Sequence, residues 1–234
     1  MGGCGSSLAL IIIVALLVVC ACCAQGQGVE NPWLGNQLGI TDEAPAPWTP
    51  VEVGDQQVSV WGRSYTWDGG PLPEQIVSQS VELLGYRADL YVQVAAPDIL
   101  PFPEADQQVV EQTEASVTLR HSTQAGGFTL NTTTTIEFDG FCRVRMTLTP
   151  DGDVAVDAVK LIVPIRSEVA DVFSRYLNYD FAALRTDKKS FATSIQHIEG
   201  VINEPFNPEV WVGNKQVGLC WSAETNVAWL QEDL

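Results

Sequence analysis

The chain has 234 residues, of which 46 % are hydrophobic and 18 % charged, so it is long enough to bury one substantial core. Its formal net charge of −17 argues against nucleic acid and anionic lipid as partners, because an acidic surface repels phosphate groups. We therefore expect one globular domain that does not bind nucleic acid.

The first 24 residues predict a signal peptide rather than part of the fold. Residues 8–19 form an unbroken apolar run, shorter than the about 20 residues that a membrane span needs. Two processing routes fit residues 19–24. Cleavage after Ala24 would release a secreted protein, whereas residues 19–22 approximate a bacterial lipobox in which Cys22 would carry the lipid. We expect a secreted or cell-envelope protein that touches a membrane only through such an N-terminal anchor, with residues 25–234 forming the domain.

Downstream, the sequence predicts antiparallel β-structure. Strands are expected, in chain order, at Gln57 to Trp67, Tyr86 to Val94, Ala115 to His121, Phe128 to Phe138, Phe141 to Leu148 and Val154 to Ile165. The strongest hairpin signal is Asp139-Gly140, since both residue types tolerate the backbone of tight turns. Further turns are expected at Gln124 to Gly127 and Thr149 to Asp153. Short strands separated by such turns are typical of an all-β fold, an antiparallel β-sandwich.

One segment, Ser167 to Tyr179, has a different period. Its apolar residues follow helical spacing behind a capping Ser167; they are Val169, Val172, Phe173, Tyr176 and Leu177. This spacing predicts a single short helix within the sandwich.

The chain closes with a further predicted hairpin. Two apolar runs, Val210 to Val212 and Val217 to Trp221, flank Gly213-Asn214-Lys215-Gln216, in which Gly and Asn are expected to take positive φ. The chain stops five residues after Trp229, and we expect that more protein normally lies beyond it.

Outside the N-terminal segment there are two cysteines, Cys142 and Cys220. An oxidising compartment would allow them to pair. Strand alternation places Cys142 on the core face of its strand and Cys220 on the face opposite to Leu219 and Trp221. We therefore expect two separate thiols.

The sequence contains few patterns typical of catalytic or metal-binding sites. His121 and His197 lie in no spacing typical of a metal site, and Asp151 and Asp153 fit a polar turn better than a calcium site. The adjacent acidic pairs Asp42-Glu43 and Glu232-Asp233 lie in an irregular segment and at the chain end, so solvated loop charge explains them better than glycoside hydrolysis. We expect no catalytic residue, no metal and no cofactor in this chain.

Seven tryptophans are many for one sandwich. Most are expected to fill the core or an interdomain seam, and Trp221 is a core residue by alternation. Trp211 and Trp229, near turns, are the candidates for stacking on the apolar face of a sugar ring, with Glu224 as an acceptor for its hydroxyl groups.

Five short motifs occur in order along the chain: NPWLGNQLGITDE at residues 31–43, APWTPV at 46–51, VWGRSY at 60–65, EFDG at 137–140 and the closing hairpin. Together they resemble the N-terminal domain of glycoside hydrolase family 123-like proteins. The resemblance implies an exported bacterial protein in which a β-sandwich precedes a (β/α)8 barrel that hydrolyses β-linked N-acetylgalactosamine. The family's catalytic Asp-Glu pair belongs to that barrel, and Asp42-Glu43 matches the N-terminal motif instead.

The sequence thus predicts a non-catalytic sandwich domain that supports a C-terminal catalytic barrel. Two alternatives stay open: a free-standing carbohydrate-binding module that takes glycans, and a structural lipoprotein of the cell envelope.

Overall fold

A computed structural model of the protein describes residues 35, 37, 39–95, 98–104, 107–175, 195–197 and 209–224. The chain divides into two compact units, Met1–Ile40 and Thr41–Leu234. The predicted signal peptide with Cys22, and also Trp229, lie outside the described residues. Within the described part, no helix has the length and apolarity needed to cross a membrane.

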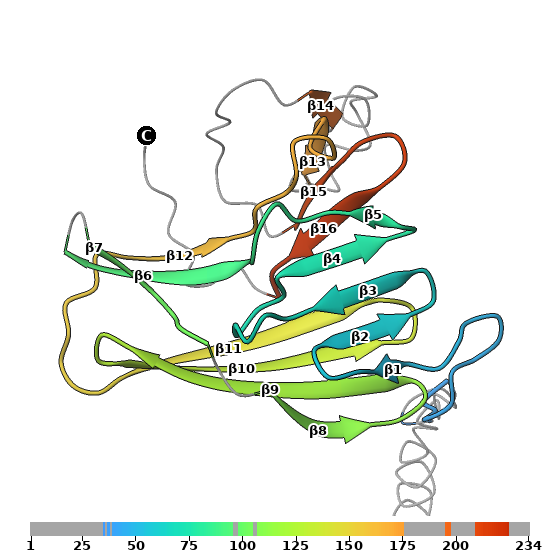
Figure 1. Ribbon diagram of the computed structural model, residues 1–234, viewed down its shortest axis with the longest axis horizontal. Coiled ribbons are helices and arrows are strands. Elements are labelled where there is room, and N and C mark those ends of the chain that lie inside the picture. Colours follow the sequence, from blue (N-terminus) through green and yellow to red (C-terminus); the bar gives the residue numbers. More distant parts are fainter. Residues whose placement is uncertain are drawn as a thin grey trace, which may run out of the picture. The chain divides into compact units, whose positions relative to one another are not determined.

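The second unit begins with a five-stranded antiparallel sheet whose strands pair in chain order (Figure 1). They are β1 (Glu52–Val53), β2 (Gln57–Val60), β3 (Arg63–Thr66), β4 (Gln75–Ser78) and β5 (Val81–Glu82). The single strand expected over Gln57 to Trp67 is therefore a hairpin, which turns at Trp61 and Gly62, where Gly62 has φ 75°. The buried residues have even numbers before this turn, Val58 and Val60, and odd numbers after it, Tyr65 and Trp67. One alternating pattern could therefore not describe both strands.

Longer strands form the opposite sheet, in the order β11-β10-β9-β8. They are β8 (Gln108–Gln112), β9 (Ser116–Ala125), β10 (Phe128–Glu137) and β11 (Cys142–Pro150). Both predicted hairpins are confirmed: β9 and β10 turn at Gly126-Gly127, with φ 55° and 83°, and β10 and β11 turn through Asp139-Gly140. In β8 the register shifts between Val109 and Glu111, which leaves Val110 as an extra residue of a β-bulge.

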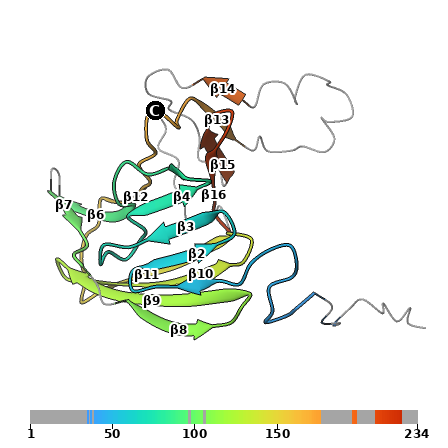
Figure 2. The same cartoon turned by 45° about the vertical axis from the view of Figure 1, so that its right-hand side comes forward.

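The described part of the unit also contains two smaller antiparallel sheets. The first has the order β12-β6-β7, from Ala158–Ile162, Asp89–Ala95 and Asp98–Pro101. The second has the order β14-β13-β15-β16, from Ile195–His197, Val172–Arg175, Glu209–Gly213 and Gly218–Ser222. In Figures 1 and 2 this last sheet lies beside the β4 and β5 end of the five-stranded sheet, where Val217 packs with Leu83 and Val169.

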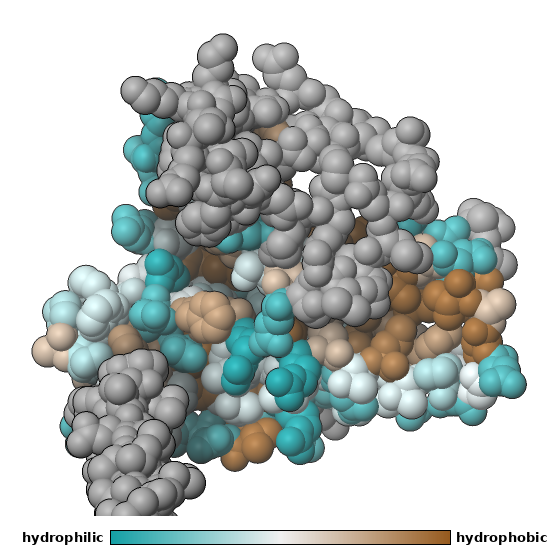
Figure 3. All heavy atoms as spheres, turned by 180° about the vertical axis from the view of Figure 1, so that it is seen from behind, coloured by the Kyte–Doolittle hydropathy of each residue, from teal (hydrophilic) through white to brown (hydrophobic). Residues whose placement is uncertain are grey.

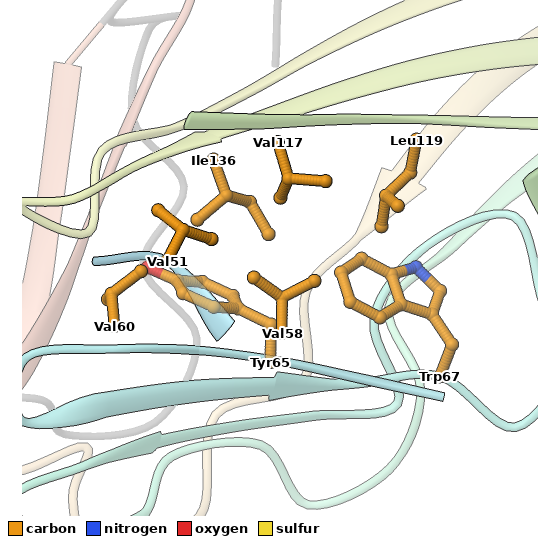
Figure 4. Close-up of a cluster of buried hydrophobic side chains, with 8 residues drawn as sticks. All are labelled: Val51, Val58, Val60, Tyr65, Trp67, Val117, Leu119 and Ile136. Atoms are coloured by element: carbon orange, nitrogen blue, oxygen red, sulfur yellow. The ribbon is translucent and has the colours of Figure 1, made fainter. Parts of the chain in front are cut away.

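The long strands β9 to β11 form one layer of a sandwich. The five-stranded sheet and the β12-β6-β7 sheet together form the other layer. At one end Val117, Leu119 and Ile136 point toward residues of β2 and β3 (Figure 4). At the other end Phe128 and Leu130 pack against Leu90 and Val92 of β6. Each such aliphatic side chain contributes roughly 1.5–3 kcal/mol when it leaves water completely. The prediction of an all-β antiparallel sandwich is confirmed.

Between the two apolar clusters lies a buried polar belt of His121, Thr123, Thr132 and Thr134. The hydroxyls of Thr123 and Thr132 donate to the carbonyls of Pro103 and Pro71, at 3.2 and 3.0 Å. The His121 ring stacks on Trp67 at a centroid distance of 6.1 Å, and neither ring nitrogen of His121 has a hydrogen-bond partner in the described structure. Burial lowers the pKa of His121.

The predicted helix is wrong over its described part. Residues 167–169 form a turn, and Val172–Arg175 is strand β13. It pairs with β14 on one side and β15 on the other. Two ladders of tertiary hydrogen bonds override the helical spacing of Val169, Val172 and Phe173, and β-branched and aromatic residues suit the strand that results.

The closing hairpin is confirmed as β15 and β16, but the backbone of its turn does not have the expected conformation. Neither Gly213 nor Asn214 has positive φ. Instead the Asn214 side-chain oxygen accepts hydrogen bonds from the amides of Gln216 and Val217, at 2.9 and 3.1 Å. The asparagine fixes the turn through its side chain, as in an Asx turn.

Both described cysteines are free thiols, as expected. Cys142 packs against the cluster formed by β2, β3, β9 and β10, and burial raises its pKa to about 12. Cys220 is exposed on β16.

Candidate functional site

An aromatic cluster of Trp48, Trp61 and Phe138 lies at one end of the sandwich. Trp48 precedes β1, Trp61 forms the β2–β3 turn, and Phe138 begins the β10–β11 turn. The Trp48 ring meets the rings of Trp61 and Phe138 edge to face, at centroid distances of 6.2 and 5.4 Å. Trp61 is 54 % exposed and Trp48 is 36 % exposed. Two indoles on two different loops are thus presented to solvent together.

Hydrogen bonds between the β2–β3 hairpin and the β10–β11 turn hold this cluster in place. The Arg63 guanidinium donates to the Asp139 carbonyl, and the Tyr65 hydroxyl donates to the Gly140 carbonyl at 2.6 Å. The Asp139 carboxylate accepts from the Phe141 amide at 2.8 Å. Burial raises the pKa of Tyr65, so its phenol remains a neutral donor at physiological pH. The aromatic cluster therefore sits on a pre-organised support.

Rigid, half-exposed indoles are suited to two kinds of contact. Their faces can stack on the apolar face of a sugar ring, and they can anchor a protein interface. One oxygen of the Asp139 carboxylate accepts the Phe141 amide. The cluster itself consists of three aromatic side chains, so it presents mainly aromatic surface to a ligand.

A second surface of interest is the edge where β11 and β12 face each other, which we call the β11–β12 edge and define by Met146, Leu148, Val159 and Leu161. Met146, Leu148 and Leu161 pack against a core cluster but are only partly buried. Val159 pairs with the buried Val92 of β6 and is 50 % exposed. From behind, apolar side chains gather over the end of the unit that carries β6 and β12 (Figure 3). Within the part of the chain that the structure describes, the sandwich core is therefore incompletely covered along this edge.

The Arg87 cluster is the main partly buried group of charges in the described structure. The Arg87 guanidinium binds the carboxylates of Asp89 and Asp68, at 3.1 and 3.5 Å, and donates to the Phe102 carbonyl at 3.3 Å. Burial raises the pKa of Asp89, while its bond to Arg87 opposes that change. Because one guanidinium engages both carboxylates, the arrangement forms a structural network rather than a separated acid and base pair.

Trp211, one of the predicted sugar-binding residues, is half-buried on β15. Its indole lies over Gly213 and Gly218, at positions where a Cβ atom would collide with the ring. Glu224 is exposed. Trp211 pairs with Cys220, so Glu224 lies four residues farther along, or about 13 Å at the rise of an extended strand. The structure does not bring these two residues together, and with Trp229 outside the described residues the predicted site stays a prediction.

No group of three or more His, Cys, Asp and Glu side chains in the described residues could hold a metal ion. Asp151 and Asp153 lie exposed in the turn after β11. The carboxylates of Asp42 and Glu43 are also exposed, and the Asp42 carbonyl accepts the Ala115 amide at 3.0 Å.

Sequence reasoning missed Trp48 and Trp61 as exposed residues. Two signals could have found them: Trp61 precedes a glycine that can take the positive φ of a turn, and Trp48 lies between prolines that cannot donate within a sheet.

Residues 51–226 match the family described as glycoside hydrolase 123, third domain. No curated protein and no solved structure matches the chain. The match agrees with the glycoside hydrolase 123 resemblance found in the sequence motifs, but it identifies the third domain and does not single out the N-terminal one. The matched region contains every described strand of the sandwich. The chain therefore belongs to the glycoside hydrolase 123 third-domain family.

Proposed function

We propose that this protein is a non-catalytic accessory domain that supports a glycoside hydrolase catalytic barrel of the β-N-acetylgalactosaminidase type. The observation that carries the proposal is the family match over residues 51–226. A position ahead of the barrel, which the resemblance to an N-terminal domain implies, is part of the same proposal.

The β11–β12 edge supports this role. A sandwich that leaves Val159 and parts of Met146, Leu148 and Leu161 in water has apolar surface that a neighbouring domain can bury. Contiguous exposed apolar surface on a folded domain commonly marks an interaction site. The catalytic barrel is the neighbour that the family membership supplies.

The test uses the full chain and a glycoside hydrolase 123 catalytic barrel produced as a separate polypeptide. Association is measured by isothermal titration for the native chain, Val159→Glu and Val110→Glu. Val159 is 50 % exposed and Val110 is 49 % exposed. The two variants therefore introduce the same charge at equally exposed positions, one on the β11–β12 edge and one on β8. We expect V159E to weaken association by about tenfold or more, since a central interface truncation costs about 2 kcal/mol, and V110E to leave it unchanged. Equal effects of the two variants, or no association, would refute the docking role.

The non-catalytic part is tested with the chain alone on 4-nitrophenyl β-N-acetylgalactosaminide. We expect no turnover above buffer. Turnover that Asp68→Asn or Asp89→Asn abolished would place chemistry in this domain and overturn the proposal.

The exposed aromatic cluster favours a second candidate function, a carbohydrate-binding module. Stacking of a sugar on Trp61 would change the emission of its indole. A titration with neutral glycans should then alter the fluorescence of the native chain and leave Trp61→Ala unresponsive, with Trp221→Ala, which removes a half-buried indole of β16, as the control. A flat titration of the native chain would exclude this second role.

Export belongs to the proposal as well, carried by the apolar run at residues 8–19. The mass of the mature protein distinguishes the two routes. A chain beginning at Gln25 indicates secretion, a lipid-modified Cys22 indicates anchoring in the cell envelope, and an intact Met1 in the fractionated protein would refute export.

A further inference from the structure

The sheet formed by β8 to β11 has an outer face that differs chemically from the rest of this acidic protein. In β9 and β10, Val117, Leu119 and Ile136 point toward the opposite layer (Figure 4). Successive side chains of a strand point to opposite faces, so the residues between them point away from the core. In Figure 1 this outer face is the underside of the layer formed by β8 to β11.

Three arginines project from this face: Arg120 on β9, and Arg143 and Arg145 on β11. All three are exposed. The register places Arg120 and Arg145 on either side of Thr133, so their Cα atoms are about 10 Å apart at the usual strand spacing. Arg143 lies two residues from Arg145, or about 7 Å along the strand. Three guanidinium groups can therefore reach a single extended ligand.

None of these arginines forms an ion pair with a described residue. The ion pairs of the described structure belong to Arg87 and Arg166. The chain has 29 acidic residues and only 12 Lys and Arg, so three unpaired arginines on one face form a cationic island. Two carboxylates share this face: Glu111 pairs with Thr118, one row from Arg120, and Glu137 lies one row from Arg143. Neither carboxylate lies next to Arg145, and neither forms an ion pair with the three arginines.

Every other outward side chain of β9 to β11 is polar. The hydroxyl and amide residues are Ser116, Thr118, Ser122, Gln124, Thr129, Asn131, Thr133, Thr135, Thr147 and Thr149. Some are linked across strands, with Thr118 and Thr135 hydroxyls 3.2 Å apart and Gln124 donating to Thr129 at 3.3 Å. Protein interfaces depend on apolar and aromatic anchors at their centre, which these strands do not present. A flat cationic face lined with hydroxyl and amide groups suits a hydrated anionic polymer better than a protein.

We propose that the outer face of β9 to β11 binds an acidic polysaccharide through Arg120, Arg143 and Arg145. The guanidinium groups bind the sulfate or carboxylate groups of the polymer, and guanidinium geometry matches both oxyanions. Sugar hydroxyls contact the neighbouring Thr and Asn side chains. This site is separate from the aromatic cluster and requires no catalytic domain, so it goes beyond the proposed function.

The net charge of −17 sets the conditions for binding. Acidic residues on the other faces repel a polyanion over long distances, but the Debye length is about 8 Å at 0.15 M salt. At that salt concentration the distant repulsion is screened, while direct contacts with the arginines persist. The proposal is therefore tested at about 0.15 M salt rather than in dilute buffer.

The experiment measures binding of dextran sulfate, hyaluronan and neutral dextran to the full chain by isothermal titration. Dextran sulfate and dextran share a backbone and differ in sulfate, while hyaluronan offers carboxylates alone. We expect binding of one or both anionic polymers and none of dextran. The double variant Arg120→Gln/Arg145→Gln should weaken binding by about tenfold, which is the loss in affinity expected when two exposed charge contacts are removed. The matched control, Lys160→Gln with Lys215→Gln, removes the same charge from two exposed lysines elsewhere and should leave binding unchanged.

Four outcomes overturn the inference. They are the absence of binding to either anionic polymer, an equal loss in both double variants, equally tight binding of duplex DNA that is lost in R120Q/R145Q, and self-association of the native chain that R120Q/R145Q abolishes. The third would mean that the face binds phosphate, and the fourth that it binds the acidic surface of a second copy. V159E should leave polysaccharide binding unchanged, so this inference and the accessory role fail separately.

Discussion

The contact between Trp211 and two glycines allows a sharp test of side-chain packing. A Cβ atom at Gly218 would lie within 2.8 Å of three indole atoms of Trp211, whereas ordinary contact begins near 3.4 Å. The backbone of Gly218 is not in the positive-φ region, so alanine is otherwise permitted there. The collision can be relieved only by moving the indole.

The expected cost depends on two opposing terms. Overpacking costs about 1–3 kcal/mol, and replacing glycine by alanine restores about 0.4–1 kcal/mol by restricting the unfolded chain. Gly218→Ala should therefore destabilise the native protein by about 1–2 kcal/mol. In a Trp211→Ala background the steric term disappears, and the same change should be neutral or stabilising by about 0.5 kcal/mol.

Gly213 provides the matched control. A Cβ atom there would meet the Val217 carbonyl at 2.5 Å and the Gly218 Cα at 2.6 Å, in addition to the Trp211 ring. Backbone atoms cannot move aside, so Gly213→Ala should remain destabilising after Trp211 is removed.

The three single and two double variants are compared by urea unfolding followed by far-UV circular dichroism, which reports mainly on the backbone rather than on the removed indole. A coupling of about 1–3 kcal/mol is expected for G218A with W211A. If G218A costs the same in both backgrounds within about 0.5 kcal/mol, the indole does not lie on Gly218.

Three further predictions concern single residues. Burial lowers the pKa of His121 in the folded protein. Below about pH 6.5 the unfolded state therefore binds a proton that the folded state does not, and the free energy of unfolding should decrease as the pH is lowered through this range. His121→Leu should remove this part of the dependence and raise stability by about 1 kcal/mol; equal unfolding free energies for native and variant from pH 7 to 5 would contradict this. Ser80 is exposed and has φ 69°, so Ser80→Gly should stabilise by about 0.5–1 kcal/mol in the same unfolding assay, and a loss of stability would show that the turn is unstrained. Because the pKa of Cys142 is raised to about 12, Ellman's reagent followed by peptide mass mapping should label Cys220 in the folded protein and Cys142 only after unfolding, and prompt labelling of Cys142 would refute its burial.

The hairpins were predictable because their signals are local. Gly140 in one turn, and Gly126 and Gly127 in the other, take the positive φ that these turns need. The alternation of β11 correctly placed Cys142 on the inner face. Where residue type and backbone conformation are linked within a few positions, the sequence is enough.

Other features depend on tertiary contacts that no local pattern contains. The strand at Val172–Arg175 exists because two neighbouring strands supply its hydrogen bonds. The shortest strands, such as Glu52–Val53, hold too few residues to show a period. The contact between Trp48 and Trp61 results from how two distant loops meet, and the cationic face appears only once the register aligns Arg120 with Arg145.

The bulge at Val110 has a consequence for solubility. Strand β8 is the outermost strand of its sheet, and it carries the exposed valines Val109 and Val110. A straight apolar edge of this kind is a template on which another chain can add a strand and begin an aggregate. The extra residue twists the edge out of register, and Glu111 comes next with a charge that a docking strand would have to desolvate. The irregularity thus keeps an exposed sheet edge from becoming a growth point for fibrils.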